Sequence, residues 1–410
     1  MSLHLPLLLA LMLAPQGDSD LGDPVKYDAM EFSFRPPTGW PMRTGIPPTI
    51  AKFQAPEKGP ENGQIAVIVL EAQQPRPLAA LVEDIKPHMA KEFASHKIVE
   101  DREVKSGGLS ARLLVVEGTS TEGREVTLVR TFVQRGLLDL YLLEGSCARK
   151  DGARIVALTE KMVGACQYGT VPTKEEAEGL ARFGDALRSL GRPPGPGEIY
   201  HIVTYGDRRL GTQRLRVGEG KVEGRPGTVF ESELVLKDED GGRKTLRSRG
   251  GISVDGAVQR VDHELEVEDK AKTRQTFKES AILTGTQVSF SREVGGQKSD
   301  TRATVPAGTL LLDIADFARG LLALKGKATY TMRVLSPFRD EPRIESLEVA
   351  APDKLKAHDG EREMVAVFSK QMRTKNIQYF FEKDGSLYRV ASGKSPLKIQ
   401  RCTKEESERP

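Results

Sequence analysis

The acidic stretch KDEDGG at residues 237–242 is the segment whose residue types come nearest to a metal site. Carboxylates two residues apart followed by glycine resemble the start of a calcium-binding loop. Such a loop also needs further oxygen ligands and a distal acidic residue that binds through both its oxygens. Here the stretch lies between the strand-like runs TVFESELVL and RKTLRSR. The sequence therefore predicts a hairpin turn rather than a calcium site.

Nucleophilic chemistry has one candidate, Cys147 in the tripeptide Gly-Ser-Cys. A catalytic thiol requires a histidine that the fold brings close to it. His88 and His96 lie in or near the first predicted helix, and the sequence places neither of them beside Cys147. We therefore predict a structural or surface thiol.

The other cysteines and histidines show no pattern of a metal or cofactor site. Cys166 and Cys402 complete a set of three cysteines without a Cys-x-x-Cys pair, so zinc is not expected. His201 and His263 lie on predicted strands and lack metal-ligand spacing. No Walker A or Gly-x-Ser-x-Gly motif occurs. The sequence predicts no catalytic residue, no metal and no cofactor, and it leaves the cysteine pairing open.

Composition indicates a globular chain of balanced charge. Its 410 residues suggest two or three domains, and 38% hydrophobic with 29% charged residues argues against disorder. Lysine plus arginine number 61 against 58 acidic residues, a net charge of +3. Such a balance gives no general case for nucleic acid or an anionic membrane as partner.

The N-terminus resembles an export signal. Residues 5–13 form an apolar run that is too short to span a bilayer, and the polar segment PQGDSD follows at once. The alternative is a disordered or mis-assigned start, because no lysine or arginine precedes the run. We predict a signal peptide at residues 1–19, a periplasmic or extracellular location, and no transmembrane segment in the mature chain.

The first half of the chain predicts an α+β domain. Strand-like segments at 30–35, 49–56 and 63–72 precede an amphipathic helix in which Leu78, Leu81, Ile85, Met89 and Phe93 recur every three or four residues. Strands near 97–105, 109–118, 125–135 and 137–145 follow, and then a helix at 151–164. This order suggests an antiparallel sheet with helices packed on it.

The segment FSFRPPTGW at residues 32–40 resembles the first strand and turn of PsbP-like domains, and the element order over residues 25–168 fits the same family. The resemblance implies a fold that is usually non-catalytic and serves in accessory or binding roles. Trp40 could cover the open end of the sheet, although ordinary core packing is the simpler reading.

Residues 172–197 are predicted to link two domains. Thr173 and Glu176 form a capping box at the start of a helix whose apolar face includes Leu180 and Phe183, and that face must pack on a domain. The following GRPPGPG at 191–197 marks the domain boundary.

The second half, residues 198–405, is dominated by strand signals at the spacing of a barrel or sandwich, with one helix at 310–326 and a short tail at 406–410. The segments YGDRRLGTQRLRV and YFFEKDGSLYRV resemble periplasmic half-barrel proteins of the LolA type and related domains of unknown function. The resemblance implies a mostly-β half-barrel or curved sheet with one helix.

Alternation along these strands predicts one apolar concave face, which is our candidate ligand-binding surface. Its residues are Phe230, Leu234, Leu236, Val288, Phe290, Tyr330, Met332, Met364 and Phe368. If the helix fills this face, the face is simply core. If the helix covers it partly, a lipid-like ligand could enter, as the half-barrel resemblance implies.

Taken together, the sequence predicts an exported, non-enzymatic, two-domain binding or accessory protein of the cell envelope. Its expected partner is an envelope protein or an apolar ligand. The alternatives are a carrier of a lipid-like ligand and a hydrolase or isomerase with an unfamiliar site. The sequence leaves the ligand and the oligomeric state open.

Overall fold

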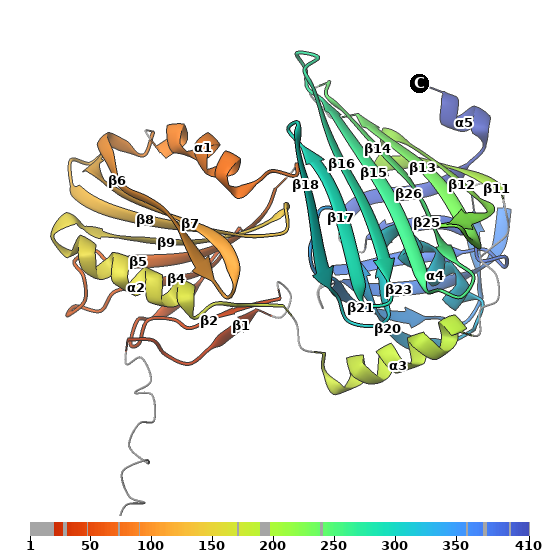
Figure 1. Cartoon of the computed structure of the whole chain (residues 1–410), viewed down its shortest axis with the longest axis horizontal. Helices are drawn as coiled ribbons and strands as arrows, with labels where there is room; N and C mark the ends of the chain where they lie inside the picture. The colour runs from red at the N-terminus through yellow and green to blue at the C-terminus, as the bar shows by residue number, and fades with distance from the viewer. Residues whose placement is uncertain are drawn as a thin grey trace, which may run out of the picture.

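The computed structural model describes residues 20–409 apart from the stretches 28–30, 47, 73, 90, 170–171, 189–196, 238–240, 358–359, 372–374 and 393–394. The predicted signal peptide, most of the predicted 191–197 linker and the centre of the KDEDGG turn therefore lie outside the described residues. The chain folds into an N-terminal α+β domain and a larger, mostly-β C-terminal domain (Figure 1). This confirms the predicted fold class.

The N-terminal domain is built on a seven-stranded antiparallel sheet in the order β3-β4-β5-β9-β8-β7-β6. Its strands are β3 (Met42–Thr44), β4 (Thr49–Gln54), β5 (Gln64–Glu71), β6 (Phe93–Ser106), β7 (Leu109–Ser120), β8 (Glu125–Arg135) and β9 (Asp139–Ala148). Neighbouring central strands are consecutive in the chain, as the predicted hairpin-length breaks require.

Two helices cover opposite faces of this sheet, α1 (Leu78–Met89) and α2 (Gly152–Gly164) (Figure 1). Successive side chains of a strand point to opposite faces. On β7, Leu113 therefore joins the core under α2, whereas Leu114 joins the core under α1. Burial on both faces explains why β7 to β9 are near-continuous apolar runs rather than alternating ones.

A small three-stranded sheet closes the domain beside the α2 core, in the order β1-β2-β10. It contains β1 (Val25–Tyr27), β2 (Phe32–Phe34) and β10 (Gln167–Tyr168). The segment that begins FSF thus contributes two buried rings, Phe32 and Phe34, and Trp40 is partly buried against the same core.

The structure corrects the prediction for this half at its short elements. Helix α1 ends at Met89, and Phe93 begins β6 rather than completing a helical stripe. The strands β1, β3 and β10 were not predicted, because two or three residues are too few to show a period. Pro87 lies inside α1.

The C-terminal domain is one strongly curved sheet of sixteen strands. From β18 to β11 the order follows the chain in reverse, and β26, β25, β24, β23, β21, β20 and β19 continue it, while β22 pairs only with β23. The first eight strands are β11 (Gly197–Tyr205), β12 (Arg208–Val222), β13 (Arg225–Lys237), β14 (Arg243–Ser253), β15 (Val258–Glu268), β16 (Arg274–Thr284), β17 (Gln287–Val294) and β18 (Gln297–Thr304). The others are β19 (Thr309–Leu311), β20 (Ala328–Leu335), β21 (Arg343–Val349), β22 (Asp353–Ala357), β23 (Gly360–Gln371), β24 (Lys375–Phe381), β25 (Leu387–Ser392) and β26 (Ser395–Cys402).

Helix α4 (Leu312–Ala323) lies on the inner side of this curved sheet (Figure 1). Its buried residues Ile314, Ala318 and Leu322 pack into one core with side chains from both halves of the sheet. The predicted helix at 310–326 is therefore confirmed, although Leu310 and Leu311 belong to β19.

Helix α3 (Lys174–Arg188) packs on the C-terminal domain beneath β20 (Figure 1). Its capping box is present: the Thr173 N–H donates to Glu176 Oε2 at 2.8 Å, and the Glu176 N–H donates to Thr173 Oγ1 at 3.2 Å. Phe183 enters the C-terminal core, and the Arg182 Nε donates to the carbonyl of Thr329 at 3.0 Å. The helix predicted as part of a linker is thus docked on the second domain.

The chain end forms a further helix, α5 (Lys404–Glu408), where the sequence suggested a tail. Thr403 and Glu406 make a second capping box, and the Arg209 Nη2 donates to the carbonyl of Ser407 at 2.6 Å. Within the described parts of the chain, no helix combines the length and apolarity needed to cross a bilayer.

Candidate functional site

Five of the nine residues predicted to line an apolar face belong to the core of the C-terminal domain. Phe230, Val288, Phe290, Tyr330 and Met332 are all buried in the cluster that surrounds α4. The Phe230 ring lies 5.2 Å, centroid to centroid, from the ring of Phe317 on that helix. The alternation of these strands therefore identified their inward side chains.

The other four residues lie elsewhere. Leu234 and Leu236 are half-buried further along β13. Met364 belongs to a separate cluster with Tyr388, and Phe368 is 37% exposed. The phase of β23 was misread, because residues 364–368 are all apolar and a period of two cannot choose between their faces.

Helix α4 is fastened to the inner face by a buried arginine. Arg319 is fully buried, and its Nε and Nη2 donate to the two oxygens of Glu345 at 2.8 and 2.6 Å. Ser369 Oγ donates to the same carboxylate at 2.7 Å, and the guanidinium lies 4.8 Å from the Tyr379 ring centroid. Bidentate charge-assisted bonds of this kind fix a side chain strongly. The helix therefore acts as a pinned part of the core.

The opposite, outer face of the same sheet carries two rows of charged residues. In the first row, cross-strand register joins residues of alternating sign across seven strands, β12 to β18. They are Arg214, Glu233, Arg247, Glu264, Lys278, Glu293 and Lys298. Facing pairs are spaced by the distance between neighbouring strands, about 4.8 Å.

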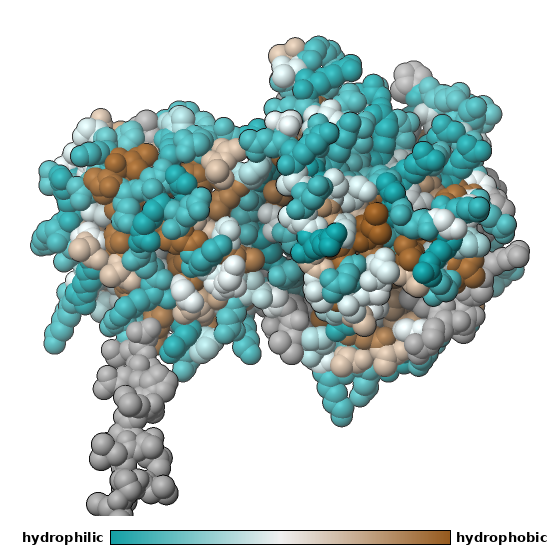
Figure 2. Space-filling model, viewed as in Figure 1, coloured by the Kyte–Doolittle hydropathy of each residue, from teal (hydrophilic) through white to brown (hydrophobic). Residues whose placement is uncertain are grey.

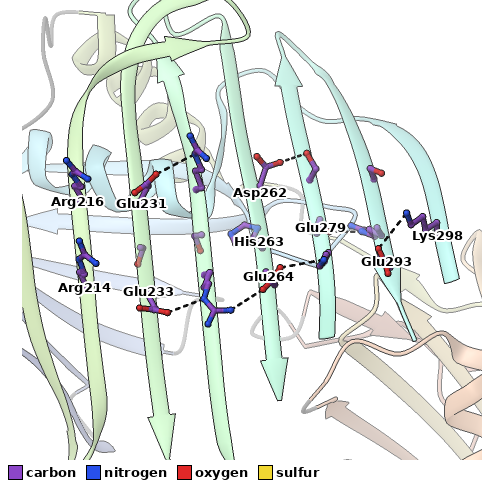
Figure 3. A pocket seen from close by; sticks show the side chains of 18 residues that line it. Arg214, Arg216, Glu231, Glu233, Asp262, His263, Glu264, Glu279, Glu293 and Lys298 are labelled. Atoms are coloured by element: carbon purple, nitrogen blue, oxygen red, sulfur yellow. Dashed lines mark hydrogen bonds and ion pairs between the residues drawn. The ribbon is translucent and has the colours of Figure 1, made fainter. Parts of the chain in front are cut away.

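The second row runs parallel to the first, two residues away along each strand. It contains Arg216, Glu231, Arg249, Asp262, Ser280 and Ser291 in register. Both rows stand in front of the sheet in Figure 3, and His263 and Glu279 lie between them. His263 and Glu279 are buried, because their side chains point to the inner face.

The two rows enclose a trough of about 670 Å³, and we use this name for it below. Its two rows carry six arginine or lysine side chains against five aspartate or glutamate side chains. A second hollow of about 380 Å³ shares Arg214 and Glu233 with it and reaches Lys404 and Glu408 of α5. Figure 2 shows hydrophilic side chains over the upper part of the C-terminal domain, where these strands lie.

Ion pairing within the trough is uneven. Arg247 is held on both sides, with its Nε 3.1 Å from Glu233 Oε1 and its Nη1 3.0 Å from Glu264 Oε1. These bonds, Glu233 first, raise the pKa of Arg247. By contrast, Arg249 is 3.6 Å from Glu231 and Lys298 is 3.9 Å from Glu293, and these two cations are 79% and 81% exposed. Arg249 within the second row and Lys298 at the end of the first row are therefore loosely paired.

Of the thiols and histidines singled out in the sequence, Cys402 is half-buried and His88 and His96 are exposed, whereas the other four are buried. Cys147 and Cys166 lie in the N-terminal core as free thiols, and burial raises their pKa values to about 11 and about 12. His201 is fully buried in the C-terminal domain. His263 Nε2 lies 2.8 Å from Asp313 Oδ2 on α4, which joins the sheet to the helix. Among the described residues, no group of three or more His, Cys, Asp or Glu side chains is arranged to hold a metal ion.

Our sequence reasoning did not find the trough. Its signal was present as charged residues at every second position of consecutive strands, as in RLR, ESE, RSR and DHE. These residues give no site in the sequence alone, because the pairing of strands that aligns the charges is not visible in a single strand.

Comparison with known proteins finds distant structural likeness only. No protein-family model matches the chain, and no curated protein matches it by sequence. A β-barrel-like protein of a domain of unknown function from Brucella abortus is 12% identical, with a TM-score of 0.39, over 51% of this chain and 95% of its own. Cyanobacterial PsbP from Synechocystis is 13% identical, with a TM-score of 0.29, over 38% of this chain and 95% of its own. The Ran-binding protein Mog1p of Saccharomyces cerevisiae is 12% identical, with a TM-score of 0.28, over 36% of this chain and 94% of its own.

Proposed function

We propose that this protein is an exported, non-enzymatic accessory protein of the cell envelope whose C-terminal domain docks a polypeptide segment of mixed charge in the trough. In this proposal the N-terminal half is PsbP-like and the C-terminal half is a half-barrel of the LolA type. The observation that supports the docking role best is the alternation of charge across seven consecutive strands.

The sign pattern argues for a protein partner rather than a polyanion. Each basic side chain of the first row has an acidic side chain on the neighbouring strand, as Arg247 has Glu233 and Glu264. A partner whose charges all have one sign would face a side chain of the same sign on every second strand and would be repelled there. A segment that carries both signs can instead form complementary pairs along the trough, which favours specificity and correct register.

The loosely paired cations of the trough are the positions where new ion pairs with a partner should contribute most to the free energy of binding. Arg216 and Arg249 lie on the second row, and Arg249 is 3.6 Å from its nearest acidic partner. Surface pairs of this kind contribute only about 0–1 kcal/mol. Breaking such a surface pair so that the arginine can bind a carboxylate of the partner therefore costs little free energy. The exclusion of water on docking then strengthens the new ion pair.

The carrier alternative has less support from the geometry. A lipid-like ligand on the inner face would have to displace side chains of α4 such as Ile314 and Leu322, which are buried in the core. It would also have to break the contacts of Arg319 with Glu345. Breaking a buried charge pair by losing one partner costs about 3–5 kcal/mol. Moving α4 aside to admit a ligand would therefore be energetically unfavourable.

The docking proposal is tested by photocrosslinking in the cells that naturally produce the protein. A photoreactive amino acid replaces Ser291 in the trough or, as control, Lys52 on the exposed side of β4. We expect a discrete protein adduct from position 291 only, and its loss when Glu264→Lys is added. The purified partner should then bind the Glu264→Lys protein at least about tenfold more weakly, or ~1.4 kcal/mol. The same adducts from both positions, or none from 291, would overturn the proposal.

Export is tested separately by mass. If residues 1–19 are a signal peptide, the intact mass of protein recovered outside the cytoplasm should lack about that many N-terminal residues. Recovery of the full-length chain in the cytoplasm alone would contradict the envelope location and would leave the docking proposal standing.

A further inference from the structure

The two domains meet where the tip of the β8–β9 hairpin reaches the C-terminal domain near β17 (Figure 1). Leu137 and Leu138 at this tip pack into an apolar cluster with four buried residues of the C-terminal domain. These residues are Val267, Phe277, Val294 and Phe338. The Leu137 N–H also donates to the carbonyl of Phe338 at 2.8 Å. We call this contact the junction.

Charged residues of both domains pair on one side of the apolar contact. Arg135 is 5% exposed, and its Nη1 donates to Glu31 of its own domain at 2.9 Å. Its Nη2 and Nε donate to Glu341 Oε2 of the other domain at 2.6 and 3.1 Å. A guanidinium thus bridges the domains through three hydrogen bonds.

In a second group of ion pairs, the donors come from the C-terminal domain. Asp139 at the hairpin tip accepts from Arg339 and, at 2.7 Å, from Arg343 Nη2. Arg339 Nη2 reaches Glu71 on β5 at 2.9 Å. Burial, together with the nearby Arg343, lowers the pKa of Arg339 to about 10, so the guanidinium remains charged at neutral pH.

The loop of the C-terminal domain that contacts the hairpin tip contains Phe338 and Arg339. Hydrogen bonds from its own domain hold this loop in place. The N–H of Phe338 donates to both oxygens of Glu279 at 3.0 Å, and the Arg292 Nη2 donates to the carbonyl of Arg339 at 2.9 Å. Arg292 is itself bonded to Glu279 at 2.6 Å. These bonds hold the loop in position independently of the N-terminal domain.

Backbone geometry shows how closely the surfaces fit. Gly136 has φ +66°, and a Cβ there would lie 2.9 Å from the Cα of Arg339 and 2.9 Å from the carbonyl oxygen of Phe338. Two non-glycine residues of the junction, Glu31 and Phe338, have φ values of +49° and +58°. Such conformations persist only where the surroundings over-determine them.

We infer that the junction is a self-sufficient protein–protein interface, in which the C-terminal domain binds the Arg135–Asp139 hairpin tip and its flanking acids even without a covalent connection between the domains. The occupant is this chain's own N-terminal domain. The apolar contact, the hydrogen-bonded ion pairs beside it and the loop held in place from within the C-terminal domain are the features of an interface rather than of a tether. The inference does not depend on the proposed function.

The test is to cut the connection in the folded, full-length protein. A specific protease site is inserted between Gly169 and Pro172, so that α3 stays with the C-terminal domain and only the junction holds the other fragment. After cleavage, we expect both fragments to elute as one species at low-micromolar concentration, and native mass spectrometry should show a one-to-one complex. Separation of the cleaved wild-type protein into two species would overturn the inference.

A matched pair of glycine variants shows whether the junction causes the association. Gly136→Ala adds a Cβ that meets the other domain, whereas Gly123→Ala in the β7–β8 turn has a similar φ of +81° and no atom within 4 Å. The cleaved Gly136→Ala protein should dissociate, and the cleaved Gly123→Ala protein should stay intact. Equal behaviour of the two would overturn the inference.

A second variant guards against local unfolding. Leu137→Ser combined with Leu138→Ser removes the apolar centre without a backbone clash. Trp40, the only tryptophan, packs against the N-terminal core, so its fluorescence reports whether that domain stays folded. Dissociation with unchanged Trp40 emission supports the inference, and continued association with unchanged emission contradicts it.

Discussion

Single buried charges determine how the C-terminal core is held together. Arg319 has no exposed surface, yet Glu345 and the Tyr379 ring accompany its guanidinium. The burial of such a residue cannot be recognised from the sequence, because an arginine on a helix is ordinarily exposed to solvent. Sequence reasoning found the helix and missed the residue that fastens it.

Arg319→Ala should destabilise the protein by about 3–5 kcal/mol, because Glu345 is left as a buried charge without its partner. The control is Arg249→Ala, which removes a cation that is 79% exposed and should cost at most about 1 kcal/mol. Urea unfolding at pH 7 measures both. A loss below about 1 kcal/mol for Arg319→Ala would show that the buried pair contributes little.

His201 should make the folded protein sensitive to acid. Its Nε2–H donates to the Leu387 carbonyl at 3.2 Å, its Nδ1 has no hydrogen-bond partner among the described residues, and burial lowers its pKa to about 4. In the unfolded chain its pKa is near 6.5, so the unfolded state takes up a proton that the folded state excludes. Stability is therefore lost as the pH falls from about 6.5 towards about 4.

We expect the wild-type protein to lose about 2–3 kcal/mol more than His201→Gln between pH 7 and pH 4.5. His88→Gln, on the exposed side of α1, should follow the wild-type curve. Denaturant unfolding at several pH values measures the difference. Parallel curves for the wild type and His201→Gln would rule out this role for the histidine.

Long periodic segments were predictable from the sequence, and very short strands were not. The strands β6 to β9 and helix α2 lie close to their predicted ranges, because hydrophobic period and Gly-rich breaks agree there. The two-residue β10 pairs with β2 only through tertiary contact. The amphipathic face of α3 predicted that the helix packs on a domain, but the sequence did not indicate on which of the two domains.

A comparison of two glycines of α3 tests that docking. A Cβ at Gly179 would lie 2.3 Å from Thr331 Oγ1 of β20, whereas a Cβ at Gly184 meets nothing within 4 Å. Gly179→Ala should therefore destabilise the protein by about 1–3 kcal/mol through overpacking. Gly184→Ala should stabilise it by about 0.5–1 kcal/mol, because alanine favours the helix. Thermal or urea unfolding compares them, and equal stability would mean that α3 is not seated on β20.

For the whole molecule, the sequence indicated an α+β sheet followed by a curved sheet, and both sheets are present; the curved sheet carries α3 and α5 as well as the predicted helix. It did not indicate the trough, because that surface exists only once strands far apart in the chain, such as β12 and β18, lie in one sheet. It also missed the junction, where Arg135 meets Glu341 across more than two hundred residues. Both features depend on register and domain contact, which leave no local pattern.

If the trough recognises alternating charge, as we propose, a peptide whose charges alternate should bind it better than one whose charges are grouped. Two Ala-rich helical peptides of identical composition are compared. In one, Glu and Lys alternate along a face at a spacing of about 5–6 Å, near the spacing of strands. In the other, all Glu residues precede all Lys residues, so that net charge and length are unchanged.

We expect the alternating peptide to bind the full-length protein at least about tenfold more tightly, equivalent to ~1.4 kcal/mol, in calorimetric or fluorescence titration. That preference should disappear in the Arg247→Glu variant, which breaks the alternation at the centre of the first row. Equal affinity for the two peptides, or an unchanged preference in Arg247→Glu, would contradict the proposed role of the trough.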